Sequence, residues 1–323
     1  MKTWIDFDDA PVFVIPLSEE IDGRTVCEGM LIEGPQGWGE FSPPRTSDDR
    51  SAARWLTAAI EAGTVGWPDP VRGRVPVAVT VPAVDPASAG RIVAASGCRT
   101  AAVTVGRPGA GLDADTARVA AVRDALGPGG SIRCDADGGW DVETAVRSVP
   151  VLDRAAGGLE FIEQPCATLP EIAALRRRIA VPVAVDQSVR DADEPHLLDL
   201  SGAADIAVLT VGPLGGVRRA LRVAENCGLP CVVAGAVETS VGAAGGLALA
   251  GVLPDTGFAP SLTVTALLTG DVVSPGRSLV PAGGYLPVAP MPPAPDRDRL
   301  GRWGDTDALQ WWRGRLAAAA RYL

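Results

Sequence analysis

Acidic side chains follow three short apolar runs in the middle of the chain. Asp135 and Asp137 follow the run in SIRCDADGGW, Glu163 ends the run in GLEFIEQP, and Asp186 ends the run in VPVAVDQSV. Each interval between these acids is about the length of one strand, one helix and two loops. Such intervals predict parallel strands joined by helices, with the acids converging at one end of the sheet.

Three converging carboxylates repel each other at neutral pH unless a cation lies between them. Because ligand sets made only of oxygen favour Mg²⁺ over zinc or copper, Mg²⁺ is the cofactor that this pattern implies. The alternative is that each acid caps a loop or carries a surface charge. The shared register of the three runs favours the cation site over that alternative.

The overall composition limits the classes of binding partner that are expected. The chain has 323 residues, of which 47% are hydrophobic and 21% are charged, and a formal net charge of −10. This charge argues against nucleic acid or an anionic membrane as a partner and leaves a small-molecule substrate. No apolar run approaches the length of a transmembrane helix, and the N-terminus does not resemble a signal peptide. We therefore expect a cytoplasmic protein, and the sequence leaves its oligomeric state open.

Residue types that usually transfer protons are scarce. Lys2 is the only lysine and His196 is the only histidine, so the usual proton acceptors at neutral pH are almost absent. We expect His196 on the surface, in a helix near 194–200. The six cysteines contain no CxxC pair, which argues against a zinc site or a disulfide framework and predicts reduced thiols.

The sequence patterns divide the chain into a cap and a barrel. Apolar segments broken by turns predict a small antiparallel sheet within residues 1–75, followed by a helix at 51–62. From residue 76 strands and helices alternate, which predicts a (β/α) barrel over residues 76–284. No GxGxxG sequence follows an early strand and no GxxxxGK[ST] sequence occurs, which argues against dinucleotide and P-loop folds. The expected strands are 76–81, 100–105, 131–135, 159–163, 181–186, 205–211, 230–234 and a weak last one at 258–262.

The C-terminal segment 285–323 is expected to complete the cap. Its Pro-rich first part predicts an irregular strap, and residues 306–321 predict a helix. In a barrel of this kind the chemistry lies at the carboxyl ends of the strands. Read in order, these ends carry Thr104, Asp135 with Asp137, Glu163, Asp186 with Gln187, Thr210, Ala234 with Gly235, and Ser261.

These motifs together resemble a known family. Acids ending strands in DAD, EQP and DQS, behind an α+β cap, resemble the enolase superfamily, whose fold is a (β/α)7β TIM-type barrel with an N-terminal α+β capping domain. GPQGWGEFSP, AAGGLEFIEQPCAT, ADIAVLTVGPLGGV and VETSVG resemble its o-succinylbenzoate synthase branch of actinobacterial type. The resemblance spans about residues 10–275. It implies Mg²⁺ at Asp135, Glu163 and Asp186, holding a substrate carboxylate while a neighbouring proton is removed.

The chain departs from this family at the residues that transfer protons. The family carries Lys-x-Lys where this sequence has Ala102 and Thr104, and a further lysine where it has Thr210. A threonine hydroxyl is not a base near pH 7, and loss of such a base commonly removes several kcal/mol of transition-state stabilisation. Other departures are Asp135-Ala136-Asp137 for Asp-x-Asn, Asp186-Gln187-Ser188 for Asp-Glu-Ser, and SEEIDG in a loop near residue 22 that usually offers Arg.

Other groups at the predicted barrel mouth are candidates for the missing roles. Asp137 and Glu238 would act as bases if burial raised their pKa, although a helix cap or a supporting role is the simpler interpretation of both. Thr104, Thr210 and Ser261 would donate hydroxyl hydrogen bonds to carbonyl groups of a substrate.

Three functions are consistent with the sequence. The first is a repurposed enzyme of secondary metabolism that positions a carboxylate- or carbonyl-bearing substrate for a cyclisation or pericyclic rearrangement. The second is a binding or regulatory pseudoenzyme. The third is an o-succinylbenzoate synthase, the Mg²⁺-dependent dehydratase of menaquinone biosynthesis, that uses an atypical base. The scarcity of lysine favours the first.

Overall fold

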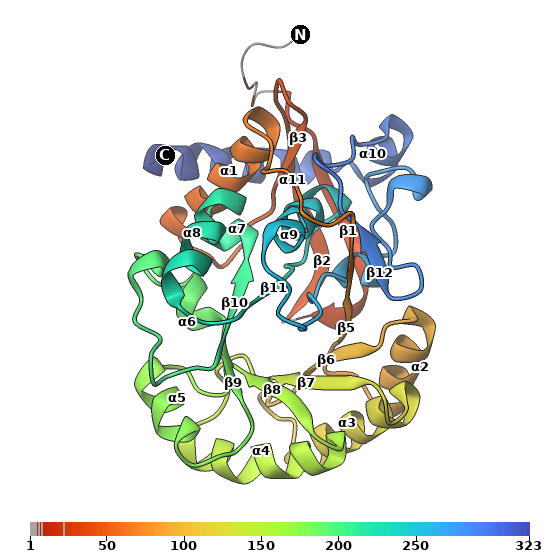
Figure 1. Ribbon diagram of the computed structural model, residues 1–323. Helices are drawn as coiled ribbons and strands as arrows, with labels where there is room; N and C mark the ends of the chain where they lie inside the picture. Colours follow the sequence, from red (N-terminus) through yellow and green to blue (C-terminus); the bar gives the residue numbers. More distant parts are fainter. Residues whose placement is uncertain (1–4, 6, 8, 22) are drawn as a thin grey trace.

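The N-terminal part of the chain forms a small antiparallel sheet. The computed structural model describes residues 5, 7, 9–21 and 23–323, so Lys2 lies outside the described residues. The sheet has the order β1-β2-β3 and consists of β1 (Val12–Ile21), β2 (Arg24–Glu33) and β3 (Trp38–Phe41). In Figure 1 it lies above a curled sheet whose outer side is covered by helices.

Helix α1 (Asp49–Thr64) packs on β3. The Asp48 side chain caps the helix by accepting a hydrogen bond from the Ser51 amide at 2.7 Å. A side chain at Gly39 would lie 2.1 Å from the Ala59 carbonyl oxygen, so only glycine permits this approach of strand and helix. The helix thereby covers one face of the N-terminal sheet.

The curled sheet is parallel and has seven strands in sequence order, with β5 and β11 at its edges. Most of its side chains are buried, as expected for a parallel sheet covered by helices. The strands are β5 (Ala78–Val81), β6 (Thr100–Thr104), β7 (Ser131–Asp135), β8 (Leu159–Glu163), β9 (Val183–Val185), β10 (Ile206–Thr210) and β11 (Cys231–Ala234). The helices around it are α2 (Pro86–Ser96), α3 (Leu112–Leu126), α4 (Val142–Ala156), α5 (Leu169–Arg176), α7 (Val211–Leu214), α8 (Val217–Cys227) and α9 (Ser240–Val252).

The expected weak strand at 258–262 does not form a full eighth strand. Instead a short extended segment joins the two edges of the sheet. The Ser261 amide donates to the Val233 carbonyl at 2.9 Å, on the side of β11. On the other side, the Ala78 amide of β5 donates to the Pro260 carbonyl at 2.8 Å. These bonds close the curled sheet into the (β/α)7β pattern with a minimal last strand.

Local sequence decides two helix boundaries. A capping box begins α5, where the Thr168 and Glu171 side chains satisfy each other's backbone amides. The α-helix expected at 194–200 is wrong. Only the 3₁₀ helix η1 (Pro195–Leu197) forms within this range, and the short helix α6 (Gln187–Arg190) precedes it. Leu198 is extended (φ −66°, ψ 128°), so the chain leaves the helical path.

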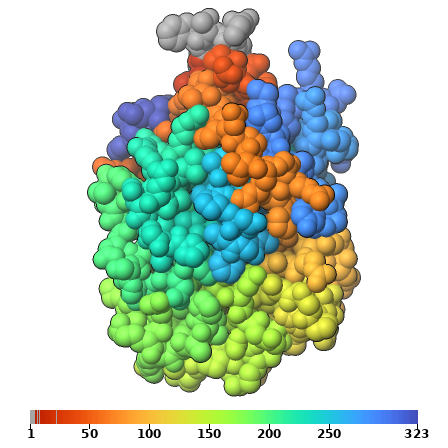
Figure 2. Space-filling model, in the orientation of Figure 1, coloured from red at the N-terminus to blue at the C-terminus, as the bar shows by residue number. Residues whose placement is uncertain are grey.

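The C-terminal segment returns to the N-terminal sheet. Strand β12 (Tyr285–Pro287) pairs antiparallel with β4 (Arg74–Pro76), which gives the Pro-rich strap an anchor. Helices α10 (Arg297–Trp303) and α11 (Thr306–Ala319) follow, and α11 packs on α1. Figure 2 shows blue C-terminal residues beside red and orange N-terminal residues in the upper part of the molecule.

Trp312 of α11 is the main anchor of this contact. Its side chain is fully buried, its ring meets that of Phe41 edge to face at 5.9 Å, and its Nε1 donates to Glu28 at 3.3 Å.

None of the described helices is both long and apolar enough to cross a bilayer.

We predict that Trp312→Ala lowers the free energy of unfolding by about 3–5 kcal/mol, because it leaves a cavity between the C-terminal helix and the N-terminal sheet. Trp311→Ala is the matched control, since Trp311 is 36% exposed, and it should cost clearly less. Urea unfolding followed by circular dichroism measures both. Equal losses for the two variants would contradict the anchoring role of Trp312.

Candidate active site

A cavity of about 810 Å³ lies between the carboxyl ends of the parallel strands and the N-terminal sheet. Its wall combines residues of β2, of α1 and the segment before it, and of the ends of the strands. Eleven residues that the sequence places at strand ends or at the family's lysine positions line it: Ala102, Thr104, Asp135, Asp137, Glu163, Asp186, Gln187, Thr210, Ala234, Gly235 and Ser261. Glu238, the remaining candidate, is not among the lining residues.

Strand register brings the acids to one level. In the parallel ladder Asp135 pairs with Thr104 on one side and with Glu163 on the other. Glu163 in turn pairs with Ala184, two residues before Asp186. Because these pairs lie at the carboxyl ends of β6 to β9, the three carboxylates face the same cavity. The predicted convergence therefore follows from the ladder itself.

Gln164 fixes the turn that carries Asp186, and the sequence analysis did not assign it a role. Its buried side chain accepts hydrogen bonds from the Asp186 amide at 3.0 Å and the Ser188 amide at 3.2 Å. Its Nε2 donates to the Ser188 hydroxyl at 2.8 Å. A non-glycine residue at φ +38° is unusual, so the backbone here is held by its surroundings. The Gln after Glu in the EQP motif was the available signal.

The three acids share an unfavourable electrostatic environment. Burial, followed by repulsion from neighbouring carboxylates, raises the pKa of Asp135 to about 7 and raises that of Glu163 well above its ordinary value. Burial also raises the pKa of Asp186, although Arg190 opposes this effect. Arg190 Nη1 lies 2.9 Å from Asp186 Oδ2, while Asp186 Oδ1 is buried without a hydrogen-bond partner. The three carboxylates are therefore only partly compensated by positive charge.

The donor atoms suit a hard cation such as Mg²⁺, because all three side chains are carboxylates and one buried oxygen has no partner. The side chains nevertheless do not close around one point. In the part of the chain that the structure describes, no group of three or more His, Cys, Asp or Glu residues is arranged to hold a metal ion. Arg190 contacts Oδ2 of Asp186, so Oδ1 is the oxygen of this residue that remains for a cation.

Asp137 belongs to a separate polar group beside the three acids. It has φ +48°, accepts a hydrogen bond from Arg107 Nη1 at 2.8 Å and accepts another from Gln187 Nε2. The backbone amide of Asp137 donates to Asp135 Oδ1 at 2.9 Å. The two departures from the family motifs, Asp137 and Gln187, thus form one hydrogen-bonded pair. The Asp137 carboxylate accepts the hydrogen bond that the Gln187 amide donates, so the two side chains suit each other.

Arginines supply the positive charge of the cavity wall. Arg24, near the start of β2, lines the cavity, although the SEEIDG loop before it offers no arginine. Arg54 of α1 donates to the carbonyls of Arg190 and Ala192 at 2.9 and 2.7 Å and holds the loop after α6 against the cap. Arg45 is paired with Glu28 and lies 4.3 Å from the centre of the Trp311 ring. Arg24 directly follows the SEEIDG sequence, and this proximity could have identified it as a cavity residue.

Hydroxyl groups also line the cavity. Thr104 ends β6 and Thr210 ends β10, and Ala102 lies beside Thr104 on the same strand. Ser261 accepts a hydrogen bond from Arg133 Nη2 at 2.8 Å, so its own proton is available to another acceptor. None of the described residues that line the cavity is lysine, histidine, cysteine or tyrosine.

Glu238 and His196 lie away from the cavity. Burial raises the pKa of Glu238 to about 8, and the neighbouring Glu40 adds to this effect. Glu40 accepts hydrogen bonds from the Thr239 and Gly242 amides at the start of α9, so this pair of acids joins the cap to the barrel. His196 is 41% exposed and lies 3.6 Å from Glu194, as expected for a surface residue.

Comparisons with known proteins define the class. Residues 86–293 match the family described as enolase C-terminal domain-like, and residues 12–63 match the one described as enolase N-terminal domain-like. The chain belongs to the enolase superfamily. Its fold is that of muconate lactonizing enzyme from Pseudomonas fluorescens, with a TM-score of 0.78 and 21% identity over 94% of this chain and 98% of the other.

Relatives with higher sequence identity to this chain share one name. An o-succinylbenzoate synthase from Thermobifida fusca (strain YX) is 52% identical over 95% of this chain and 94% of its own length. One from Mycobacterium tuberculosis (strain ATCC 25177 / H37Ra) is 43% identical over 95% of this chain and 92% of its own length. These names favour the third function of the sequence analysis over the first.

We predict that Glu238→Gln makes stability less dependent on pH. The folded pKa of Glu238 lies above its unfolded value of about 4.3, so the folded state keeps a proton that the unfolded state releases. Stability is therefore lost as pH rises from about 4 towards 8. Between pH 5 and 8 the variant should gain more than about 1 kcal/mol relative to wild type.

Thermal unfolding at several pH values tests this prediction. Glu40 retains a raised pKa in the variant, so the loss of stability with rising pH should become smaller without vanishing. Glu225→Gln, on the exposed side of α8, is the control and should follow wild type. If the stability of Glu238→Gln and of wild type declines equally with rising pH, the folded state does not keep a proton on Glu238.

Proposed function

We propose that this chain is a cytoplasmic lyase of the o-succinylbenzoate synthase type, which acts on a small carboxylate-bearing substrate without a lysine in its cavity. Full-length similarity to proteins of that name supports the reaction class. The observation that carries the proposal is the convergence of Asp135, Glu163 and Asp186 on one cavity that also exposes arginines of the cap. The partner is then a small molecule that carries at least one carboxylate.

The charge of the cavity supports a role for Mg²⁺. Carboxylates outnumber guanidinium groups among the lining residues, so an anionic substrate would be repelled from the cavity without an added cation. Asp135, Glu163 and Asp186 would hold the ion, which would neutralise the substrate carboxylate and acidify the adjacent carbon. Arg24 and Arg190 would pair with the remaining anionic groups of the substrate, because a guanidinium binds a carboxylate through two hydrogen bonds.

Asp137 is the group that we propose as proton acceptor in the elimination. It lines the cavity next to Asp135, and Arg107 and Gln187 hold its carboxylate in a fixed orientation. A carboxylate is a weaker base than a lysine amine, so we expect a slow enzyme. The proton that Asp137 accepts would pass to the departing hydroxide, so that the C–H and C–O bonds break, a C=C bond forms and water is released.

A second function is favoured by the lysine-free wall. Thr104, Thr210 and Ser261 line the same cavity as the acids, where their hydroxyl groups would bind carbonyl oxygens and hold a flexible substrate in one conformer. Cyclisation or pericyclic rearrangement of such a substrate requires no base. Thus the same cavity would serve a repurposed enzyme of secondary metabolism.

We predict that the wild-type protein binds Mg²⁺ and that Glu163→Gln weakens binding by more than the roughly 10–100-fold that loss of a supporting residue costs. Isothermal titration calorimetry with MgCl₂ measures both affinities. Asp191→Asn is the control, because Asp191 lines the cavity with a side chain that is 73% exposed, and it should bind as wild type does. Equal affinities for Glu163→Gln and wild type would argue against this ligand set.

We also predict that the protein, with Mg²⁺, dehydrates the hydroxy acid that yields o-succinylbenzoate, and that Asp137→Asn slows this by about 10²–10⁴-fold. Product absorbance follows the reaction, and Asp191→Asn should remain near wild type. If no product forms, the elimination is excluded. Binding of the hydroxy acid without turnover would then point to the second function or to a non-catalytic binding protein.

A further inference from the structure

Two cysteine side chains lie in contact at the amino-terminal end of the barrel. Cys227 is the last residue of α8 and Cys231 is the first residue of β11, and their sulfur atoms are 3.6 Å apart. The turn between them contains Gly228, with φ +67°, and Pro230. Other sulfur contacts shown for the described residues run to backbone carbonyls, such as that from Cys27 to Val237. The CxxxC spacing therefore brings together a pair that a search for CxxC does not find.

The two thiols differ in access and in acidity. Cys227 is partly exposed, whereas Cys231 is buried at 8% exposure. The contact between the two sulfur atoms lowers the pKa of the Cys227 thiol and raises that of Cys231, which burial raises further. The carbonyl end of α8 opposes the first of these effects. Reagents from solvent thus meet Cys227 first, with Cys231 directly behind it.

We propose that Cys227 and Cys231 form a redox-active thiol pair that closes reversibly to an intramolecular disulfide when the protein meets a hydroperoxide. Closure requires the two sulfurs to approach from 3.6 Å to about 2.05 Å. The residues lie only a short turn apart, and that turn contains a glycine, so side-chain rotation and a small turn adjustment provide this movement. The inference is independent of the proposed function.

The chemistry balances with the peroxide as the only oxidant. The Cys227 thiolate attacks one peroxide oxygen, which breaks the O–O bond, forms a sulfenic acid and releases water or an alcohol after proton uptake. The Cys231 thiol then attacks the sulfenic sulfur, forms the S–S bond and releases water. Both sulfurs are oxidised and the peroxide is reduced. A dithiol such as dithiothreitol reverses the reaction by thiol–disulfide exchange.

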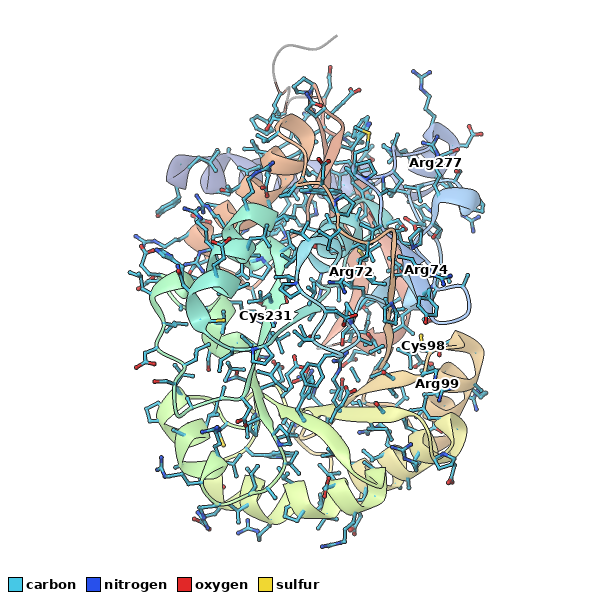
Figure 3. All side chains as sticks on the ribbon, viewed as in Figure 1. Arg72, Arg74, Cys98, Arg99, Cys231 and Arg277 are labelled. Atoms are coloured by element: carbon cyan, nitrogen blue, oxygen red, sulfur yellow. The ribbon has the colours of Figure 1, made fainter. Side chains whose placement is uncertain are left out.

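The location of the two cysteines in the barrel determines which properties of the protein their oxidation would change. Cys231 begins β11, whose other end, Ala234, lines the cavity. The amino-terminal side of a barrel serves stability rather than chemistry. We therefore expect oxidation to change the thermal stability of the protein more than the properties of the cavity. In Figure 3 Cys231 lies left of centre and Cys98 lies on the right, well apart from each other, so Cys98 is a suitable control.

The test uses hydrogen peroxide, denaturing alkylation and mass spectrometry of the purified full chain. Both cysteines fall between Arg222 and Arg277 with no intervening Lys or Arg, so one tryptic peptide carries both and no other cysteine. Peroxide should lower the mass of that peptide by two hydrogen atoms and abolish its alkylation, and dithiothreitol should restore both thiols. Cys98→Ser should behave as wild type.

Variants of the pair separate the steps. Cys231→Ser should accumulate a sulfenic acid at Cys227 that a dimedone probe traps, whereas Cys227→Ser should leave Cys231 unreacted at the same peroxide dose. The proposal is overturned if both thiols of oxidised wild-type protein remain alkylatable, if the product is a disulfide between two chains, or if Cys98 oxidises as fast as Cys227.

Discussion

Mutual repulsion among three buried carboxylates is the constraint on which the rest of the site depends. The ladder from β6 to β9 sets Asp135 and Glu163 in register, and the Gln164 side chain fixes the turn that adds Asp186. Such a cluster is costly unless positive charge compensates it. The cap and the loops provide part of that charge through arginines, of which Arg190 already contacts Asp186. What remains is a demand for a cation, and a bound ion together with an anionic substrate meets that demand.

The cap matters to the site through two kinds of contact. Glu28, Arg24 and Arg54 contribute cavity wall, and Arg54 also holds the loop after α6, so the cavity exists only when cap and barrel are together. Glu40 reaches across to the start of α9, and Trp312 locks the C-terminal helix against the N-terminal sheet. Substrate binding and the stability of this interface are therefore expected to be coupled, because the same segments serve both.

Much of the fold and part of the site were predictable from local sequence. Strand and helix alternation and the acids at Asp135, Glu163 and Asp186 follow from spacing, since parallel strands force their ends together. The weak strand at 258–262 and the helix at 194–200 were less predictable, because hydrogen bonds to β5 and β11 decide the first and the extended Leu198 ends the second. Arg24 and the Cys227–Cys231 pair depend on distances that only the folded chain defines. Glu238 was misjudged as a cavity group because its position near a strand end gives no direction for its side chain.

The central claim is that three buried acids converge on this cavity while its described wall has no amine to accept a proton. The most direct measurement is the incorporation of solvent deuterium next to the carboxylate of a bound substrate, with Mg²⁺, compared with the Thermobifida fusca relative and with Lys2→Arg of this chain. The account predicts far slower exchange than in the relative and no change on replacing Lys2. Exchange as fast as in the relative, or its loss in Lys2→Arg, would contradict it.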